Sequence, residues 1–190
     1  MKRRAAPTAS IKPRIGISAC LLGEPVRYDG GHKRDAWLVN ILGRRVEYVP
    51  VCPEVEFGLG VPRDTIRLQR GKNGIRLVVE KTGRDITRAM DQFTRRRVRA
   101  LARENLSGYI FKKNSPSCGV AGVKVFNKKN IFQPVGVGRF AAMLMRMHPQ
   151  LPVADESELQ TPPQRNQFLA RALAYQRRRQ SITARKTSAG

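Results

Sequence analysis

The feature that most constrains the fold of this chain is a set of three short apolar runs, each followed closely by a cysteine. The runs lead into Cys20, Cys52 and Cys118. Each run has the length and composition of a buried strand, and ligands of an open α/β sheet bind at the carboxyl ends of its strands. We therefore expect the three thiols to converge on one point, although they lie far apart in the sequence.

The other segments alternate between strand-like and helix-like patterns. Strands are expected over residues 14–19, 46–51, 108–112, 123–126 and 151–153, with a hairpin over residues 66–79. Helices are expected over residues 35–42, 85–104, 138–147 and 164–179, the second being the longest. This alternation predicts an α/β fold, a single three-layer domain with a mainly parallel sheet, helices on both faces and a small hairpin.

The chain divides into a central domain and two basic ends. Residues 1–12 are expected to form a disordered basic tail, residues 13–160 the α/β domain, and residues 161–190 a C-terminal helix followed by a disordered basic tail. The N-terminal segment lacks the apolar stretch of a secretory signal, and no run reaches the roughly 18 apolar residues that span a bilayer. We therefore expect a cytoplasmic protein without membrane contact.

The charge balance indicates an anionic partner. The chain has 37 Lys and Arg against 14 Asp and Glu, a formal net charge of +23. Arg88, Arg95, Arg99 and Arg103 fall on one side of the helix expected over residues 85–104. Nucleic acid is the obvious polyanion, and contact with phosphates requires only positive charge. A merely solvated helix face, or a proteome that is basic throughout, remains as the alternative.

The cysteines themselves favour a metal cluster. An odd number of cysteines in a cytoplasmic protein argues against a disulfide framework. Thiolate ligands select zinc, copper(I) or iron–sulfur clusters, and structural zinc requires four ligands in close sequence pairs. This chain has three widely separated cysteines, which suits an iron–sulfur cluster with one iron left free. The alternative is three unrelated buried thiols.

Two side chains next to these cysteines are candidates for acid–base chemistry. Glu54 lies two residues beyond Cys52 and is placed to exchange a proton with a substrate or with water. Its alternative role is to cap the following turn. Ser115 precedes Cys118 by three residues and is a candidate for orienting a substrate or a water molecule. Serine hydroxyls also stabilise turns, which is the alternative for this residue.

Three further residues are candidate substrate contacts, namely Tyr28, Asp29 and Ser117. Asp29 precedes a Gly-Gly pair and is equally typical of a turn. Gly119 follows the third cysteine, and we expect its lack of a Cβ to let the backbone approach the cluster closely.

Taken together, the segments around the cysteines resemble the thiouracil desulfurase family. The resemblance is carried by residues 18–23, 26–34, 49–56 and 115–119, in this order, and extends over approximately residues 14–160. Residues 31–34 and 54–60 are most similar to the branch of the family that acts on 4-thiouridine in tRNA. Members of that branch often carry a second, helical domain downstream, which this chain is expected to lack.

The resemblance implies an enzyme with a [4Fe–4S] cluster held by Cys20, Cys52 and Cys118. It implies a non-redox desulfuration of thiolated uracil, in which the open iron captures the thiocarbonyl sulfur. Glu54 would activate a water molecule for attack on the ring carbon, and Ser115 would assist through a hydrogen bond.

The substrate implied is 4-thiouridine or 2-thiouracil, as a free base, a nucleoside or a residue of tRNA. In the last case the Lys and Arg surface would take the place of the second domain. The alternative hypothesis is a nucleic-acid-binding module whose metal cluster is structural or redox-sensing.

Overall fold

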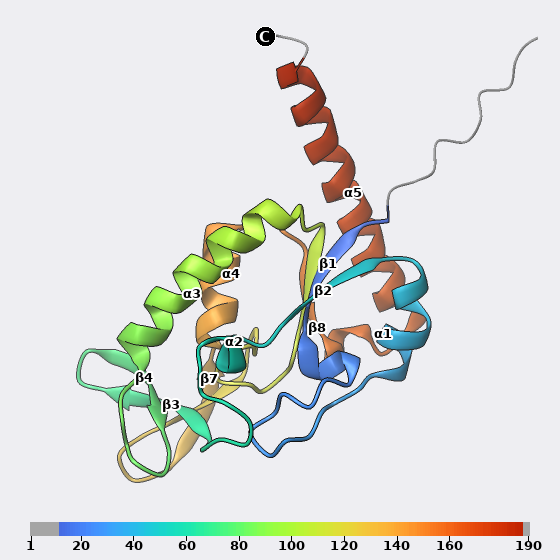
Figure 1. The fold of residues 1–190 in the computed structure, drawn as a ribbon. Helices are drawn as coiled ribbons and strands as arrows, with labels where there is room; N and C mark the ends of the chain where they lie inside the picture. Colours follow the sequence, from blue (N-terminus) through green and yellow to red (C-terminus); the bar gives the residue numbers. More distant parts are fainter. Residues whose placement is uncertain (1–11, 188–190) are drawn as a thin grey trace, which may run out of the picture.

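Two four-stranded sheets and the helices around them make up residues 12–187, the part of the chain that the computed structural model describes (Figure 1). Residues 1–11 of the expected N-terminal tail and the last residues, 188–190, lie outside the described part. The first sheet has the order β2-β1-β5-β8, and each pair of neighbours is parallel. Its strands are β1 (Arg14–Ser18), β2 (Glu47–Val51), β5 (Gly108–Phe111) and β8 (Val153–Asp155).

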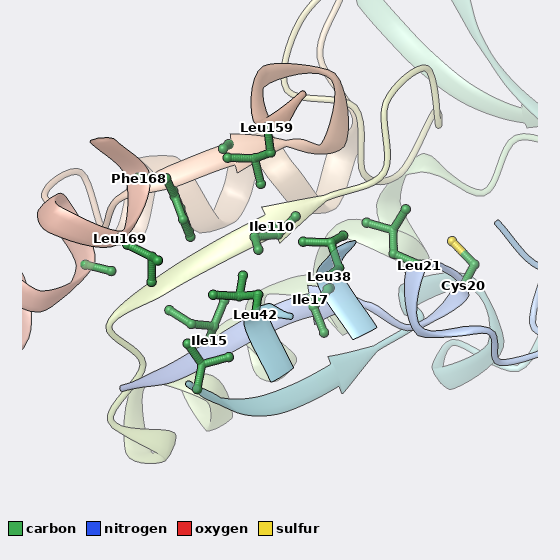
Figure 2. Packing of buried hydrophobic residues seen from close by; sticks show 13 residues of the cluster. Ile15, Ile17, Cys20, Leu21, Leu38, Leu42, Ile110, Leu159, Phe168 and Leu169 are labelled. Atoms are coloured by element: carbon green, nitrogen blue, oxygen red, sulfur yellow. The ribbon is translucent and has the colours of Figure 1, made fainter. Parts of the chain in front are cut away.

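Helices cover both faces of this parallel sheet. On one face lie α1 (Ala36–Asn40) and α5 (Pro162–Thr187), and their apolar side chains form one core cluster with the residues of β1 and β5 (Figure 2). On the other face lie α3 (Thr87–Leu101) and α4 (Arg139–Met147), which form a second cluster with the opposite side of β5. The expected three-layer α/β fold is thereby confirmed.

The hairpin expected over residues 66–79 is present and belongs to a larger second sheet. Its strands are β3 (Ile66–Gly71), β4 (Gly74–Val79), β6 (Val123–Phe126) and β7 (Phe132–Gly136), in the order β4-β3-β6-β7. The strand at residues 123–126 therefore pairs with the hairpin and not with the parallel sheet. The sequence did not predict β7, because its first four residues are exposed and include Pro134, so it lacks the pattern of a buried strand.

The longest helix of the described part is α5, with 26 residues, and not α3, with 15. Residues 180–187 were expected to be disordered, but α5 continues to Thr187. No Gly or Pro follows Arg179 within the helix, so the sequence contains no signal that would end it earlier. None of the helices between residues 12 and 187 combines the length and apolar character needed to cross a bilayer.

Two short helices follow strands of the parallel sheet at the positions of the first two cysteines. The 3-10 helix η1 (Ala19–Leu22) directly follows β1 and contains Cys20. Figure 2 shows Cys20 at one end of the core cluster, beside Leu21. The helix α2 (Pro53–Glu56) follows β2, and Cys52 is the residue before its first turn. Pro53 occupies the first helical position, where its missing N–H has no intrahelical partner to lose.

Candidate active site

The three cysteines lie at the carboxyl ends of three adjacent strands. Cys20 follows β1, Cys52 follows β2, and Cys118 lies in the loop after β5. The chain runs from β1 to β2 on one side and later returns to form β5 on the other side of β1, so the strand order reverses there, and ligands bind at such a switch point. All three cysteines line one cavity with a volume of about 330 Å³. The structure thus brings the thiols together, and their role as metal ligands stays a prediction.

Burial raises the pKa of all three thiols. The pKa of Cys20 is raised to about 11 by burial and by the neighbouring Cys52. Burial also raises the pKa of Cys52 and, most strongly, that of Cys118, where a hydrogen bond with Ser18 acts in the opposite direction. Three thiolates would repel one another in this poorly solvated site, and a bound cationic metal group is what ordinarily stabilises such a set.

The donor set fits a cluster better than a single ion. Within the described part of the chain, no group of three or more His, Cys, Asp or Glu side chains is placed to hold one metal ion. The three thiols nevertheless share a cavity, and Cys20 and Cys52 are near enough to raise the pKa of Cys118. Sulfur ligands that surround a space wider than one ion suit several soft metal ions bridged by sulfide. The ligands of such a cluster would be Cys20, Cys52 and Cys118.

Glu54 is fixed on one side of the cavity by an ion pair with Arg63. Its Oε2 accepts hydrogen bonds from Arg63 Nε at 3.1 Å and Nη2 at 2.8 Å. The side chains are only 14% and 6% exposed, respectively. Arg63 Nη1 also donates to the carbonyl oxygens of Val26 and Gly60, which ties two loops to the carboxylate. The second oxygen, Oε1, has no bond to Arg63 and is 3.5 Å from the Ser115 hydroxyl.

Ser115 combines the two roles considered for it. Its Oγ accepts hydrogen bonds from the backbone N–H groups of Ser117, at 3.1 Å, and Cys118, at 3.0 Å, and so stabilises the loop that carries the third cysteine. Both of these bonds use lone pairs of the oxygen, so the hydroxyl proton is left to donate toward Glu54 Oε1. Ser115 and Glu54 both line the cavity.

The three candidate substrate contacts differ in their positions. Tyr28 lines the cavity, and 42% of its surface is exposed. Asp29 is not among the lining residues, and its carboxylate accepts the N–H of Gly31 at 3.0 Å, which lowers its pKa and is typical of a turn. Ser117 is buried outside the lining, and its hydroxyl has no hydrogen-bond partner within the described residues. Substrate contact by these residues stays a prediction.

The reason for glycine at position 119 differs from the one expected. A Cβ at Gly119 would lie 2.4 Å from Val123 Cγ2 and 3.0 Å from the carbonyl oxygen of Ser115. The residue is therefore small because it packs against β6 and its own loop, and it does not line the cavity.

Sequence reasoning missed Arg63, which lies in a loop and is one of 37 basic residues. No local pattern distinguishes it from the others. It also missed Lys33 and Lys113, which line the cavity and whose ammonium groups have no hydrogen bond or ion pair within the described residues. Lys112, another lining residue, is ion-paired with Glu156.

The chain is similar to known proteins in both sequence and structure. The model of a family described as 2-thiouracil desulfurase matches residues 15–156. An uncharacterized Bacillus subtilis (strain 168) protein, YbbK, is 30% identical over 137 residues, which covers 68% of this chain and 88% of the relative. The solved structure of TudS, a [4Fe–4S]-dependent thiouracil desulfidase, is similar with a TM-score of 0.61 and 33% identity, over 78% of this chain and 93% of that chain. The segment matched by the family contains all three cysteines.

Proposed function

This chain belongs to the 2-thiouracil desulfurase family, and from that premise we propose that it removes sulfur from thiolated uracil at the cavity shared by its three cysteines. The observation that carries the proposal is the convergence of these thiols with Glu54 and Ser115 on one cavity. The net reaction replaces a thiocarbonyl by a carbonyl. Water supplies the oxygen and sulfur leaves as sulfide, so the exchange needs no electron donor or acceptor.

The cofactor we infer is a [4Fe–4S] cluster with Cys20, Cys52 and Cys118 as its ligands, because the similar TudS structure is described as dependent on one. When bound through three protein ligands, such a cluster supplies one iron that acts as a Lewis acid toward sulfur. The Pro53 ring and the loop around Ser115 fix the positions of two of these ligands.

The protein groups that handle the water are Glu54 and Ser115. Arg63 occupies Glu54 Oε2, and so Oε1 is the oxygen available to accept a proton from water. Ser115 lies within reach of the same oxygen and orients the water or the substrate through its hydroxyl. The ion pair fixes the carboxylate before the substrate arrives, which is the geometric requirement for a general base.

The substrates we propose are 2-thiouracil and 4-thiouridine, the latter also as a residue of tRNA. Tyr28 lies at the cavity with an exposed ring on which a pyrimidine can stack. Lys33 and Lys113 also line the cavity and provide positive charge for a phosphate attached to the nucleoside.

The test is an anaerobic assay after the iron and sulfide content has been counted. The protein is incubated with 2-thiouracil and, in parallel, with 4-thiouridine, and the release of sulfide and of uracil or uridine is measured. We expect Glu54→Gln to lower kcat by about 10²–10⁴-fold, the usual contribution of a general base, with unchanged iron content. The matched control is Glu47→Gln, in an exposed ion pair with Arg14.

Two results would contradict the proposal. One is a protein with a full cluster that releases no sulfide from either substrate, and the other is a Glu54→Gln variant as active as the wild type. A module that only binds nucleic acid would bind tRNA, release no sulfide and be indifferent to the substitution.

A further inference from the structure

The outer face of α3 carries a row of unpaired arginines. The α3 arginine row consists of Arg88, Arg95, Arg96 and Arg99 of α3 and of Arg103 in the 3-10 helix η3 (Ala102–Glu104), which directly follows α3. All five are exposed, and within the described residues none of their guanidinium groups has a hydrogen bond, ion pair or ring contact. Arg95 and Arg99 are four residues apart and therefore lie about 6 Å apart along α3, and Arg103 follows four residues later in η3.

No acidic side chain of α3 is left to neutralise this row. The single acidic residue in the helix, Asp91, is ion-paired with Arg139. Glu104, just beyond it, is ion-paired with Arg14. Like charges four residues apart destabilise a helix, and so the row is an arrangement that an external polyanion would stabilise.

The row begins in a groove between α3 and the β3–β4 hairpin. The groove has a volume of about 840 Å³, and Arg88 and Arg95 line it together with the side chains of Asn73 and Gln92. The two acidic residues in its lining, Asp85 and Asp91, are ion-paired with Arg76 and Arg139. Unpaired guanidinium groups beside amides are the groups that contact phosphate and sugar in nucleic-acid complexes.

The surroundings of the row favour a nucleic acid over a lipid surface. The apolar side of α3 is buried through Met90, Val98 and Leu101, whereas a helix that lies on a membrane inserts an apolar face into the lipid. No large hydrophobic side chain of the described residues is exposed on α3. Within α3, from Arg88 to Arg99, the row extends about 16 Å, and a nucleic-acid duplex presents one charge about every 1.7 Å over such a length.

The same helix is joined to the candidate active site. Arg97, within α3, is ion-paired with Glu56 of α2. Glu56 Oε1 also accepts the backbone N–H of Cys52 at 3.1 Å, and α2 carries Glu54. A polymer lying along the row is thus bound by a helix that is ion-paired with α2, and α2 contributes Pro53 and Glu54 to the lining of the cavity.

We propose that the α3 arginine row binds the phosphate backbone of an RNA. This proposal deepens the proposed function, because the bound RNA would present its thiolated nucleotide to the cavity. Only this presentation of the nucleotide rests on the proposed function, whereas RNA binding by the row does not.

The test measures binding of an unmodified tRNA transcript by fluorescence anisotropy over a series of salt concentrations. The variant is Arg95→Gln/Arg99→Gln, and the matched control is Arg44→Gln/Arg45→Gln. These two exposed arginines lie at the end of the 3-10 helix η2 (Leu42–Arg44), which follows α1 on the other side of the parallel sheet (Figure 1). We expect the row variant to bind several-fold more weakly and its slope of log K against log salt to be shallower by about 1.5, since each lost phosphate contact removes about 0.7–0.9. The control should match the wild type.

Three results would overturn the proposal. The first is unchanged RNA binding by the row variant, and the second is an equal loss of RNA binding in the control variant. The third is a row variant that loses binding only to vesicles of phosphatidylcholine and phosphatidylserine and not to RNA. A thermal melt of the same samples shows that the variants are folded, and turnover of free 2-thiouracil should be equal in the wild type and both variants. If the wild type releases no sulfide, the proposed function fails, while the RNA-binding result can still be read.

Discussion

The pairing of Glu54 with Arg63 decides which carboxylate oxygen is available for chemistry. Both guanidinium bonds go to Oε2, and Oε1 is left beside the Ser115 hydroxyl. A free glutamate on a short helix would sample several rotamers, whereas Arg63 is itself fixed by two carbonyl oxygens. We infer that Arg63 is a positioning residue, which acts on the reaction through Glu54.

At this scale we predict that Arg63→Met lowers kcat for 2-thiouracil by about 10²-fold, the lower end of what a general base contributes. The KM should change little, because Arg63 fixes the carboxylate and the variant leaves the other lining residues in place. Arg63→Lys should recover part of the rate, since it restores the charge but not the two parallel N–H groups. Steady-state kinetics on samples of equal iron content measure kcat and KM for both variants.

The matched control is Arg70→Met, which removes an exposed arginine without a side-chain partner within the described residues. Arg63→Met also leaves a nearly buried carboxylate unpaired, which costs about 3–5 kcal/mol of stability in comparable cases. A thermal melt therefore accompanies the kinetics. Full activity in a folded Arg63→Met variant would exclude the positioning role.

The cysteines and the glutamate next to strand ends could be predicted, whereas Arg63 could not. Cys20, Cys52 and Glu54 follow strands whose apolar runs are obvious in the sequence, so their approach to one edge follows from sheet geometry. Arg63 reaches the cavity from a loop whose path depends on tertiary contacts, and nothing local in the sequence indicates that path.

At the scale of elements, the loop that carries Cys118 is fixed by the first turn of α4. The backbone N–H groups of Arg139 and Phe140 donate to the carbonyl oxygens of Pro116 and Ser117, each at 3.0 Å. Gly138 comes so close that a Cβ would lie 2.4 Å from the carbonyl carbon of Ser117 and 2.6 Å from the backbone nitrogen of Cys118. The loop is therefore packed and hydrogen-bonded against the first turn of the helix, and the position of the third thiol depends on this contact.

We predict that Gly138→Ala displaces this loop and lowers the iron content of the purified protein. The added methyl meets backbone atoms, which cannot move aside as a flexible side chain can, and overpacking of this kind costs about 1–3 kcal/mol. Iron and sulfide counting after reconstitution, with a thermal melt, measures the effect. Gly43→Ala is the control, because its Cβ would make only ordinary contacts, at 3.4 Å and 3.5 Å. A fully loaded Gly138→Ala protein would show that the contact does not position Cys118.

Among the elements, those with a buried face were predicted well. The strands of the parallel sheet are short apolar runs, and they lie close to where the sequence places them. Of the second sheet, the sequence predicts the hairpin and the strand at residues 123–126 but not that they pair, because β3 and β6 are far apart in the chain. Side-chain patterns indicate a face for burial but not which strand will be the neighbour.

At the scale of the whole molecule, the three thiols connect the two cores of the domain. Cys20 belongs to the cluster on the α1 and α5 side of the parallel sheet, and Cys118 to the cluster on the α3 and α4 side. Cys52 follows the edge strand β2. A cluster bound by all three would thus join segments that the unfolded chain separates widely, and a group that binds only the folded state stabilises it by mass action.

We therefore predict that anaerobic removal of iron by a chelator lowers the unfolding temperature of the whole protein in a single transition. A loss of about 3 kcal/mol would lower it by roughly 6–12 °C in a domain of this size. Because both cores share the cofactor, near-UV and far-UV circular dichroism should report the same shift. The control is Cys52→Ser, which lacks one ligand and whose melting temperature the chelator should leave unchanged. If the wild type melts identically with and without iron, or only one spectral region shifts, the three thiols do not hold a common group across both faces of the sheet.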